Sequence, residues 1–222
     1  MAADGAQPRG IFVTGTGTEV GKTVVAAAIA RTLAGEEKRV AVFKPAVTGL
    51  DEGVETDYEL LRRAAGSGQS DEEIAPYRYG PPASPHLAAA LAGEEIDPER
   101  LRRAAGAAAA GAEALVCEGV GGFLVPLAPG YLLRDFAADL GYPLVVVAGP
   151  GLGTINHTLL TVEAARAAGL EVAAVVLNPW PQEPSEIERS NRETIASLAN
   201  VPILTLPRID LDDPGSWPTL IC

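Results

Sequence analysis

The chain has 222 residues, is 47% hydrophobic and carries a formal net charge of -12 at pH 7. This length suits one sizeable α/β domain, so we expect residues 1–222 to form a single domain whose first nine residues are flexible. The acidic charge argues against nucleic acid or an anionic membrane as the main partner, because both attract clustered Lys and Arg. The first ten residues lack the apolar core of a signal peptide, so we expect a cytoplasmic protein in which Cys117 and Cys222 are reduced.

A strand is predicted over residues 10–15, followed by a glycine-rich turn and a helix over residues 22–35. The turn, VTGTGTEVGKT, ends like a phosphate-binding loop, but the first glycine of the usual Gly-x-x-x-x-Gly-Lys-Thr pattern would fall on Thr16. The loop is therefore one residue longer than usual. Its backbone N–H groups and the helix dipole would converge on a polyphosphate. Lys22 would reach the β and γ phosphates, and the Thr23 hydroxyl would bind the accompanying Mg²⁺.

The rest of the chain continues to alternate between strand-like and helix-like runs. In chain order we expect a strand within 38–49, a helix over 56–66, a Pro-rich surface loop leading to a helix within 75–93, a helix over 98–113, a strand over 114–118, a strand, turn and helix over 142–169, a strand over 171–180, a helix over 190–199 and a strand within 201–210. This order predicts a three-layer α/β fold, with a doubly wound, mostly parallel sheet and a phosphate-binding loop.

Three charged residues follow predicted strands or begin a helix on the ligand side of the sheet. Glu118 ends an apolar strand, where a buried carboxylate requires a metal or a lysine. Asp57 and Glu118 could complete a magnesium site with Thr23, although Asp57 could instead be an exposed helix N-cap. Lys44 could be an ordinary surface lysine, or it could neutralise charge during phosphoryl transfer.

Four segments, GTGTEVGKT, FKPAVTG, CEGVGG and GLGTINHTLLT, resemble the dethiobiotin synthetase family in order and spacing, including the lengthened loop. The resemblance implies an ATP-dependent cyclo-ligase of biotin biosynthesis. One amine of 7,8-diaminononanoate would take up carbon dioxide, supplied as bicarbonate, and the carbamate would attack the γ-phosphate. The other amine would then close the ring, giving dethiobiotin, ADP and phosphate. The resemblance further implies Mg²⁺ as the cofactor, ATP as a co-substrate, and a homodimer with the diamine's carboxylate bound at the interface.

The same resemblance implies a role for each matching position. The catalytic residues would be Lys44, Lys22 and Thr18. The nucleotide would contact Gly17, Thr18, Glu19, Val20, Gly21, Lys22 and Thr23, with Asn178 reading the purine edge and Pro207 and Ile209 near the base. The diamine would contact Thr18, Lys44 and Thr48, and its carboxylate would meet Gly153, Thr154, Ile155 and Asn156. The magnesium ligands would be Thr23, Asp57 and Glu118.

The main alternative is a regulatory P-loop ATPase of the chromosome-partitioning or septum-placing kind. Such proteins carry a signature lysine early in the loop, and residues 15–20 contain none. Amidotransferring synthetases, which share the nucleotide half, require a glutaminase domain for which 222 residues leave no room. Neither His86, in the Pro-rich loop, nor His157, on the helix over 154–169, is expected to act as a base.

Overall fold

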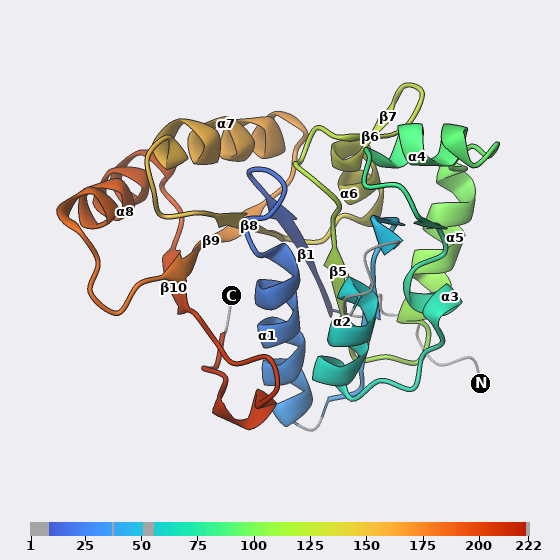
Figure 1. Cartoon of the computed structure of the whole chain (residues 1–222), viewed down its shortest axis with the longest axis horizontal. Helices are drawn as coiled ribbons and strands as arrows, with labels where there is room; N and C mark the ends of the chain where they lie inside the picture. The colour runs from blue at the N-terminus through green and yellow to red at the C-terminus, as the bar shows by residue number, and fades with distance from the viewer. Residues whose placement is uncertain (1–8, 37, 51–55, 221–222) are drawn as a thin grey trace.

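A computed structural model describes residues 9–36, 38–50 and 56–220 of the chain (Figure 1). In chain order the elements are β1 (Arg9–Gly15), α1 (Lys22–Gly35), β2 (Val40–Phe43), β3 (Val47–Thr48), α2 (Asp57–Ala65), α3 (Asp71–Ile74), β4 (Arg78–Tyr79), α4 (Pro85–Leu91), α5 (Pro98–Ala109), β5 (Ala114–Glu118), β6 (Pro126–Ala128), β7 (Tyr131–Leu132), α6 (Leu133–Leu140), β8 (Leu144–Ala148), α7 (Thr154–Ala167), β9 (Val172–Trp180), α8 (Glu186–Ala199), β10 (Ile203–Pro207) and the 3-10 helix η2 (Pro214–Ser216). Within these ranges, no helix is both long and apolar enough to cross a membrane.

The central sheet has six parallel strands in the order β10-β9-β8-β1-β5-β2. The chain moves outward from β1 on one side to β2 and β5, and then on the other side to β8, β9 and β10. The strand order therefore reverses beside β1, and in sheets of this kind ligands bind at the carboxyl ends of the strands next to that reversal. The predicted doubly wound parallel sheet is confirmed.

Helices cover both faces of the sheet because the strands are apolar on both sides (Figure 1). On one face, α1 and α2 pack against the side chains of Val13, Val42 and Val116. On the other face, α5, α6, α7 and α8 bury a second cluster, in which the ring of Phe136 on α6 contacts the rings of Phe12 and Phe43. Cys117 is buried in β5 as a free thiol, and burial raises its pKa well above the usual value; Cys222 lies outside the described residues.

Several predicted boundaries were wrong. Arg9, expected to be flexible, is the first residue of β1 because it pairs with Ala114; the rest of the predicted flexible start lies outside the described residues. The helix expected over 98–113 ends at Ala109. The helix expected from residue 190 begins at Glu186, since the Ser185 backbone N–H donates to the Glu188 carboxylate at 2.7 Å in a capping box.

Two small sheets were not predicted. β3 and β4 form a parallel pair with two residues each, joining Val47 to Arg78 and Thr48 to Tyr79. β6 and β7 form an antiparallel hairpin. Strands this short carry too little hydrophobic alternation to be recognised in a sequence. The β3–β4 pair attaches the segment after β2 to the segment before α4.

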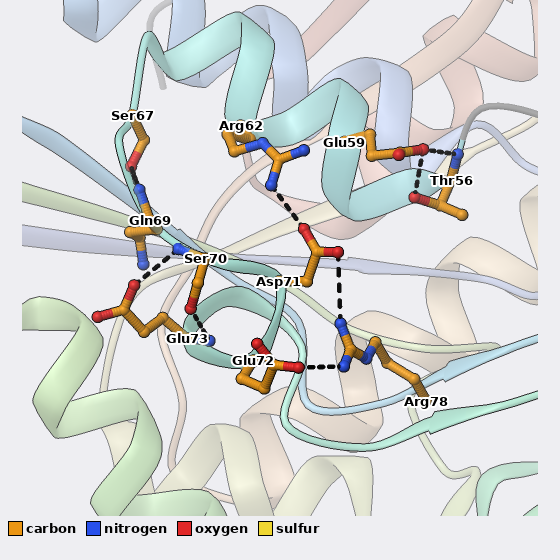
Figure 2. A network of polar contacts seen from close by, with 10 residues as sticks. All are labelled: Thr56, Glu59, Arg62, Ser67, Gln69, Ser70, Asp71, Glu72, Glu73 and Arg78. Carbon is orange, nitrogen blue, oxygen red and sulfur yellow. Dashed lines mark hydrogen bonds and ion pairs between the residues drawn. The ribbon is translucent and has the colours of Figure 1, made fainter.

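The outer edge of the central sheet is held by a side chain. Val42 of β2 donates its backbone N–H to Gln69 Oε1 at 2.9 Å, and Gln69 Nε2 donates to the Val42 carbonyl at 3.1 Å. The Ser67 hydroxyl donates to the same Gln69 oxygen at 2.9 Å. The Gln69 backbone N–H in turn donates to the Ser67 oxygen at 3.2 Å (Figure 2). The Gln69 amide thus makes the two hydrogen bonds that a neighbouring strand would otherwise make with Val42.

Candidate functional site

Five charged or hydroxyl side chains converge at the carboxyl ends of β1, β2 and β5. We call this group the Lys44 cluster; it comprises Lys22 and Thr23 at the start of α1, Lys44 after β2, Asp57 at the start of α2, and Glu118 at the end of β5. Because Phe43 pairs with Cys117 in adjacent strands, Lys44 and Glu118 leave the sheet side by side. The sequence analysis predicted all five members at one site, and the structure brings them together.

The loop before α1 bends so that its end points into this cluster. Glu19 and Gly21 both have a positive φ, at 62° and 82°, and Gly21 is the N-cap of α1. Lys22 is only 7% exposed, and its ammonium donates to the Gly17 carbonyl across the loop at 2.9 Å. Thr18 lies on the exposed outer part of the loop. The loop therefore closes around its own lysine, with Thr18 facing outward.

Asn178, near the end of β9, holds the same loop from the other side. Its Nδ2 donates to the Val20 carbonyl at 3.1 Å, and the side chain is buried. A Cβ added to Gly21 would lie 2.0 Å from Asn178 Nδ2. Glycine at position 21 is thus required both by the backbone conformation and by the close approach of the amide.

Lys44 is the centre of the cluster. Its ammonium lies 2.6 Å from Glu118 Oε1 and 2.6 Å from Asp57 Oδ2, and its side chain is 3% exposed. The Thr23 hydroxyl donates to the same Glu118 oxygen at 2.8 Å. The prediction that Asp57 could be the N-cap is wrong, because Thr56 precedes the helix in a capping box with Glu59. Asp57 is therefore the first residue of the helix, and it pairs with Lys44.

The electrostatics keep this lysine charged. Burial by itself would lower the pKa of Lys44, but the carboxylates of Glu118 and Asp57 raise it above the usual value. Burial raises the pKa of Glu118, and the Asp57 charge adds to that effect while Lys44 opposes it. Burial would also raise the pKa of Asp57, yet Lys44 holds it below the usual value. For Lys22, burial lowers the pKa despite the Glu118 charge. Little water therefore screens the opposed charges of Lys44 and Glu118, which are 3% and 1% exposed, whereas Asp57, at 44%, lies at the edge of the cluster.

The oxygens of the cluster fit a hard divalent cation. Glu118 Oε2 is buried and has no hydrogen-bond partner among the described residues, a costly state for a carboxylate oxygen. The Thr23 hydroxyl contacts the other oxygen of Glu118, and Asp57 pairs with the same lysine as Glu118 does. Mg²⁺ takes few protein oxygens and completes its shell with water and phosphate. Within the described ranges, no group of three or more His, Cys, Asp or Glu side chains could hold a metal ion.

A glycine-rich turn precedes α7 at the same edge of the sheet. Gly153 is the N-cap, with φ 89°, and it offers no side-chain cap to the first turn of the helix, which contains Thr154, Ile155 and Asn156. Asn191 of α8 donates to the carbonyls of Pro150 and Gly151 in this turn. The sequence analysis did not single out Asn191, although it interrupts an apolar stripe that continues at Ile195 and Ala199.

Other predicted residues lie around the rim of the site. Pro207 and Ile209 line a hollow of about 470 Å³ together with Trp180, beyond the end of β9 that carries Asn178. Thr48 lies in β3, half-buried. These residues are not within the Lys44 cluster. His86, predicted in a loop, lies in the first turn of α4 and is exposed, and His157 is exposed on α7.

A polar network fixes α2, and with it Asp57, to the segment that follows it (Figure 2). Arg62 of α2 lies 2.5 Å from Asp71 of α3, and Arg78 of β4 lies 3.5 Å from the other oxygen of Asp71. Arg78 also lies 2.6 Å from Glu72. Ion pairs this exposed contribute little stability individually. Together they connect the helix that begins at Asp57 to the strand that pairs with β3.

The chain is similar to known proteins along most of its length. A family model described as an AAA domain matches residues 9–213. The ATP-dependent dethiobiotin synthetase BioD of Anaeromyxobacter dehalogenans (strain 2CP-1) is 45% identical over 200 residues, covering 90% of each chain. The ATP-dependent dethiobiotin synthetase BioD of Bacillus subtilis (strain 168) is 39% identical over 197 residues, covering 88% of this chain and 85% of the relative.

The chain belongs to the dethiobiotin synthetase family. The family resemblance predicted from the sequence is confirmed, and so are the expected enzyme and its ligase class. Among solved structures, chloroplast FtsY from Physcomitrella patens superposes with a TM-score of 0.51 at 15% identity, covering 95% of this chain but only 62% of the FtsY chain. That likeness concerns the fold alone.

Proposed function

We propose that this protein uses ATP to convert 7,8-diaminononanoate and carbon dioxide into dethiobiotin at the Lys44 cluster. The observation that carries the proposal is the position of Lys44. Its ammonium is buried between two carboxylates, next to the loop that presents Lys22 and Thr23. A second lysine beside a phosphate-binding loop is suited to a reaction in which another substrate attacks the γ-phosphate.

Each residue of the site would act by binding and orienting reactants. The loop backbone and Lys22 would bind the phosphates of ATP, with Lys22 exchanging its bond to the Gly17 carbonyl for a phosphate oxygen. Lys44 would neutralise charge on the carbamate oxygen and the transferred phosphoryl group. The carbamate would then give a carbamic-phosphoric anhydride, and the second amine would expel phosphate on closing the ring. Such a reaction needs proximity and charge balance and no covalent nucleophile on the protein.

The metal ligands we propose are Thr23, Asp57 and Glu118. Support comes from Glu118 Oε2, which has no partner among the described residues, and from the oxygens of Thr23 and Asp57 in the same cluster. When bound, Mg²⁺ would offset the negative charge of the polyphosphate. Lys44 and Thr23 would then bind one oxygen of Glu118, and the other oxygen would be available to bind the metal. This assignment accounts for a buried carboxylate that Lys44 satisfies only in part.

Nucleotide and diamine contacts complete the proposal. Asn178 would read the purine edge, with Pro207 and Ile209 lining the hollow for the base. Thr18, Lys44 and Thr48 would contact the diamine. The first turn of α7, from Gly153 to Asn156, would receive its distal carboxylate, since a helix start capped by glycine leaves N–H groups for an anion.

We also propose a homodimer formed through the face around the start of α7. Three leucines on this face are unusually exposed: Leu152 at 96%, Leu160 at 56% and Leu124 at 51%. Leu124 and Leu160 line one hollow with Thr16 of the phosphate-binding loop. A second copy covering these leucines would remove apolar surface from water close to the site.

Leu152→Glu tests the proposed dimer. Light scattering should then show a monomer, and the KM for the diamine should rise. An unchanged dimer would place the interface elsewhere.

The deciding experiment measures ADP release by the purified protein with magnesium ATP and bicarbonate, with and without 7,8-diaminononanoate, and identifies dethiobiotin by mass spectrometry. We expect release only with the diamine. Lys22→Ala should abolish turnover while the protein stays folded, and Lys38→Ala, a surface lysine paired with Glu36, is the matched control. ADP release that ignores the diamine would reject the proposed reaction in favour of a regulatory ATPase.

A further inference from the structure

A buried amide on α8 holds the turn before α7. Asn191 is 8% exposed, and its Nδ2 donates to the Pro150 carbonyl at 2.9 Å and to the Gly151 carbonyl at 3.1 Å. One amide nitrogen thus uses both of its hydrogens on two successive carbonyls of the turn. Because the Asn191 side chain is buried, its amide has little access to water that could replace these bonds.

The turn itself has little that would fix its shape. Residues 149–153 read GPGLG, so three of the five positions are glycines with wide backbone freedom. Within the turn, the Thr154 backbone N–H donates to the Gly151 carbonyl at 3.2 Å, and the His157 N–H makes the first helical bond to Gly153 at 3.2 Å. The Gly151 carbonyl therefore accepts from both Thr154 and Asn191. Asn191 supplies the contacts that tie this glycine-rich turn to a neighbouring helix.

The direction of those carbonyls determines where the N–H groups point. In a trans peptide the C=O and N–H of one unit point in opposite directions. With the carbonyls of Pro150 and Gly151 directed at α8, the N–H groups of Gly151 and Leu152 point away from α8. The same constraint fixes the entry into α7, whose first N–H groups have no side-chain cap.

We propose that Asn191 is a positioning residue that holds the turn over residues 150–156 in the conformation that receives the diamine's carboxylate. The inference rests on the proposed function, because that function places the carboxylate at the start of α7. Asn191 does not touch the reacting atoms and acts through the turn. Its substitution should therefore weaken binding of the carboxylate end of the substrate and leave phosphoryl transfer unaffected.

The test compares four variants with the parent. Asn191→Ala removes both hydrogen bonds, and Asn191→Asp keeps the shape but turns a donor into an acceptor that faces two carbonyls. Asn191→Gln keeps the amide, so its KM for 7,8-diaminononanoate should lie between those of the parent and Asn191→Ala. Asn200→Asp is the matched control, because it makes the same chemical change at an exposed position just after the same helix.

Steady-state kinetics are measured with 7,8-diaminononanoate and with octane-2,3-diamine, which is the same vicinal diamine without its carboxylate. In Asn191→Ala and Asn191→Asp we expect the KM for 7,8-diaminononanoate to rise about tenfold, with kcat and the KM for ATP within about twofold of the parent. For octane-2,3-diamine, kcat/KM should be the same in parent and variants. Asn200→Asp should match the parent with both substrates.

Two results would overturn the inference. One is an unchanged KM for 7,8-diaminononanoate in either variant. The other is an equal loss with both diamines, which would mean that Asn191 supports the fold in general. If Asn191→Asp is unstable, the same two criteria are applied to Asn191→Ala and Asn191→Gln. Their KM values for 7,8-diaminononanoate and their kcat/KM values for octane-2,3-diamine are then compared. A parent protein that makes no dethiobiotin would instead reject the proposed function, so the two failures are distinguishable.

Discussion

The ammonium of Lys44 lies 2.6 Å from the carboxylate of Glu118, and both side chains are almost completely buried. They leave adjacent parallel strands one residue beyond the paired Phe43 and Cys117. A charge pair of this kind is costly to desolvate, and breaking it from one side leaves an uncompensated charge. Substituting either residue should therefore change both the free energy of unfolding and the activity of the site.

Substitutions at this pair should separate stability from activity. Lys44→Met should lower the free energy of unfolding by about 3–5 kcal/mol, because it leaves the Glu118 charge buried and unpaired. Adding Glu118→Gln should restore most of that stability, while both proteins lack turnover. Urea unfolding followed by fluorescence, together with ADP release, measures both quantities. A Lys44→Met protein as stable as the parent would contradict the placement of this charge pair.

Gly21→Ala should impair nucleotide binding. A Cβ at this position would lie 2.0 Å from Asn178 Nδ2, and the backbone has a φ of 82°. We expect a loss of stability of about 1–3 kcal/mol and at least a tenfold rise in the KM for ATP. Gly35→Ala is the matched control, because Gly35 ends the same helix at an ordinary φ, and only an arginine nitrogen lies 4.0 Å from an added Cβ. An equal response of the two variants would argue against a specific requirement at position 21.

Asn178→Ala should weaken nucleotide discrimination. The Asn178 amide donates to the Val20 carbonyl, so its loss frees the loop as well as removing the proposed contact with the base. We expect a higher KM for ATP, a smaller preference for ATP over CTP, and an unchanged dependence on magnesium concentration. Competition kinetics with the two nucleotides measure the preference. If the preference stays the same, Asn178 acts only as a support for the loop.

The capping box at the start of α2 should make a small, pH-dependent contribution to stability. The Thr56 backbone N–H donates to the Glu59 carboxylate at 2.9 Å, and this bond lowers the pKa of Glu59 below its usual value of 4.5. A carboxyl whose pKa is lowered by folding stabilises the protein above pH 4.5, and this contribution disappears as the pH falls through the folded-state pKa. Thermal melts of Glu59→Ala should therefore differ from the parent at pH 6, and the difference should shrink as the pH is lowered below 4.5. Glu193→Ala, on an exposed part of α8, controls for the loss of a charge. If the difference in melting temperature between Glu59→Ala and the parent grows as the pH falls, the capping role of Glu59 is refuted.

Much of the site could be predicted because its residues follow strands. Lys44 and Glu118 each lie at the end of an apolar run, and parallel strands bring such ends to one edge. The sequence also placed Lys22 and Thr23 correctly at the start of a helix. The distances between these groups depend on strand register, and register follows from packing across the whole sheet.

Other features depend on contacts that no local pattern reveals. Asn191 meets Pro150 only because α7 and α8 lie side by side, and 40 residues separate it from Gly151. The N-cap of α2 is different, because Thr56 and Glu59 form a capping-box pattern that could have been recognised in the sequence. The two-residue strands β3 and β4 exist because tertiary contacts align them, so their own residues carry almost no signal.

The Gln69 amide described above also restricts how copies of this protein can associate. β2 is the last strand on its side of the sheet, and an open strand edge invites pairing with a strand of another molecule. With the backbone of Val42 already bonded to Gln69, a continuous intermolecular sheet through β2 would first have to displace that side chain. Gln69 thus protects this part of the β2 edge from pairing with a strand of another molecule.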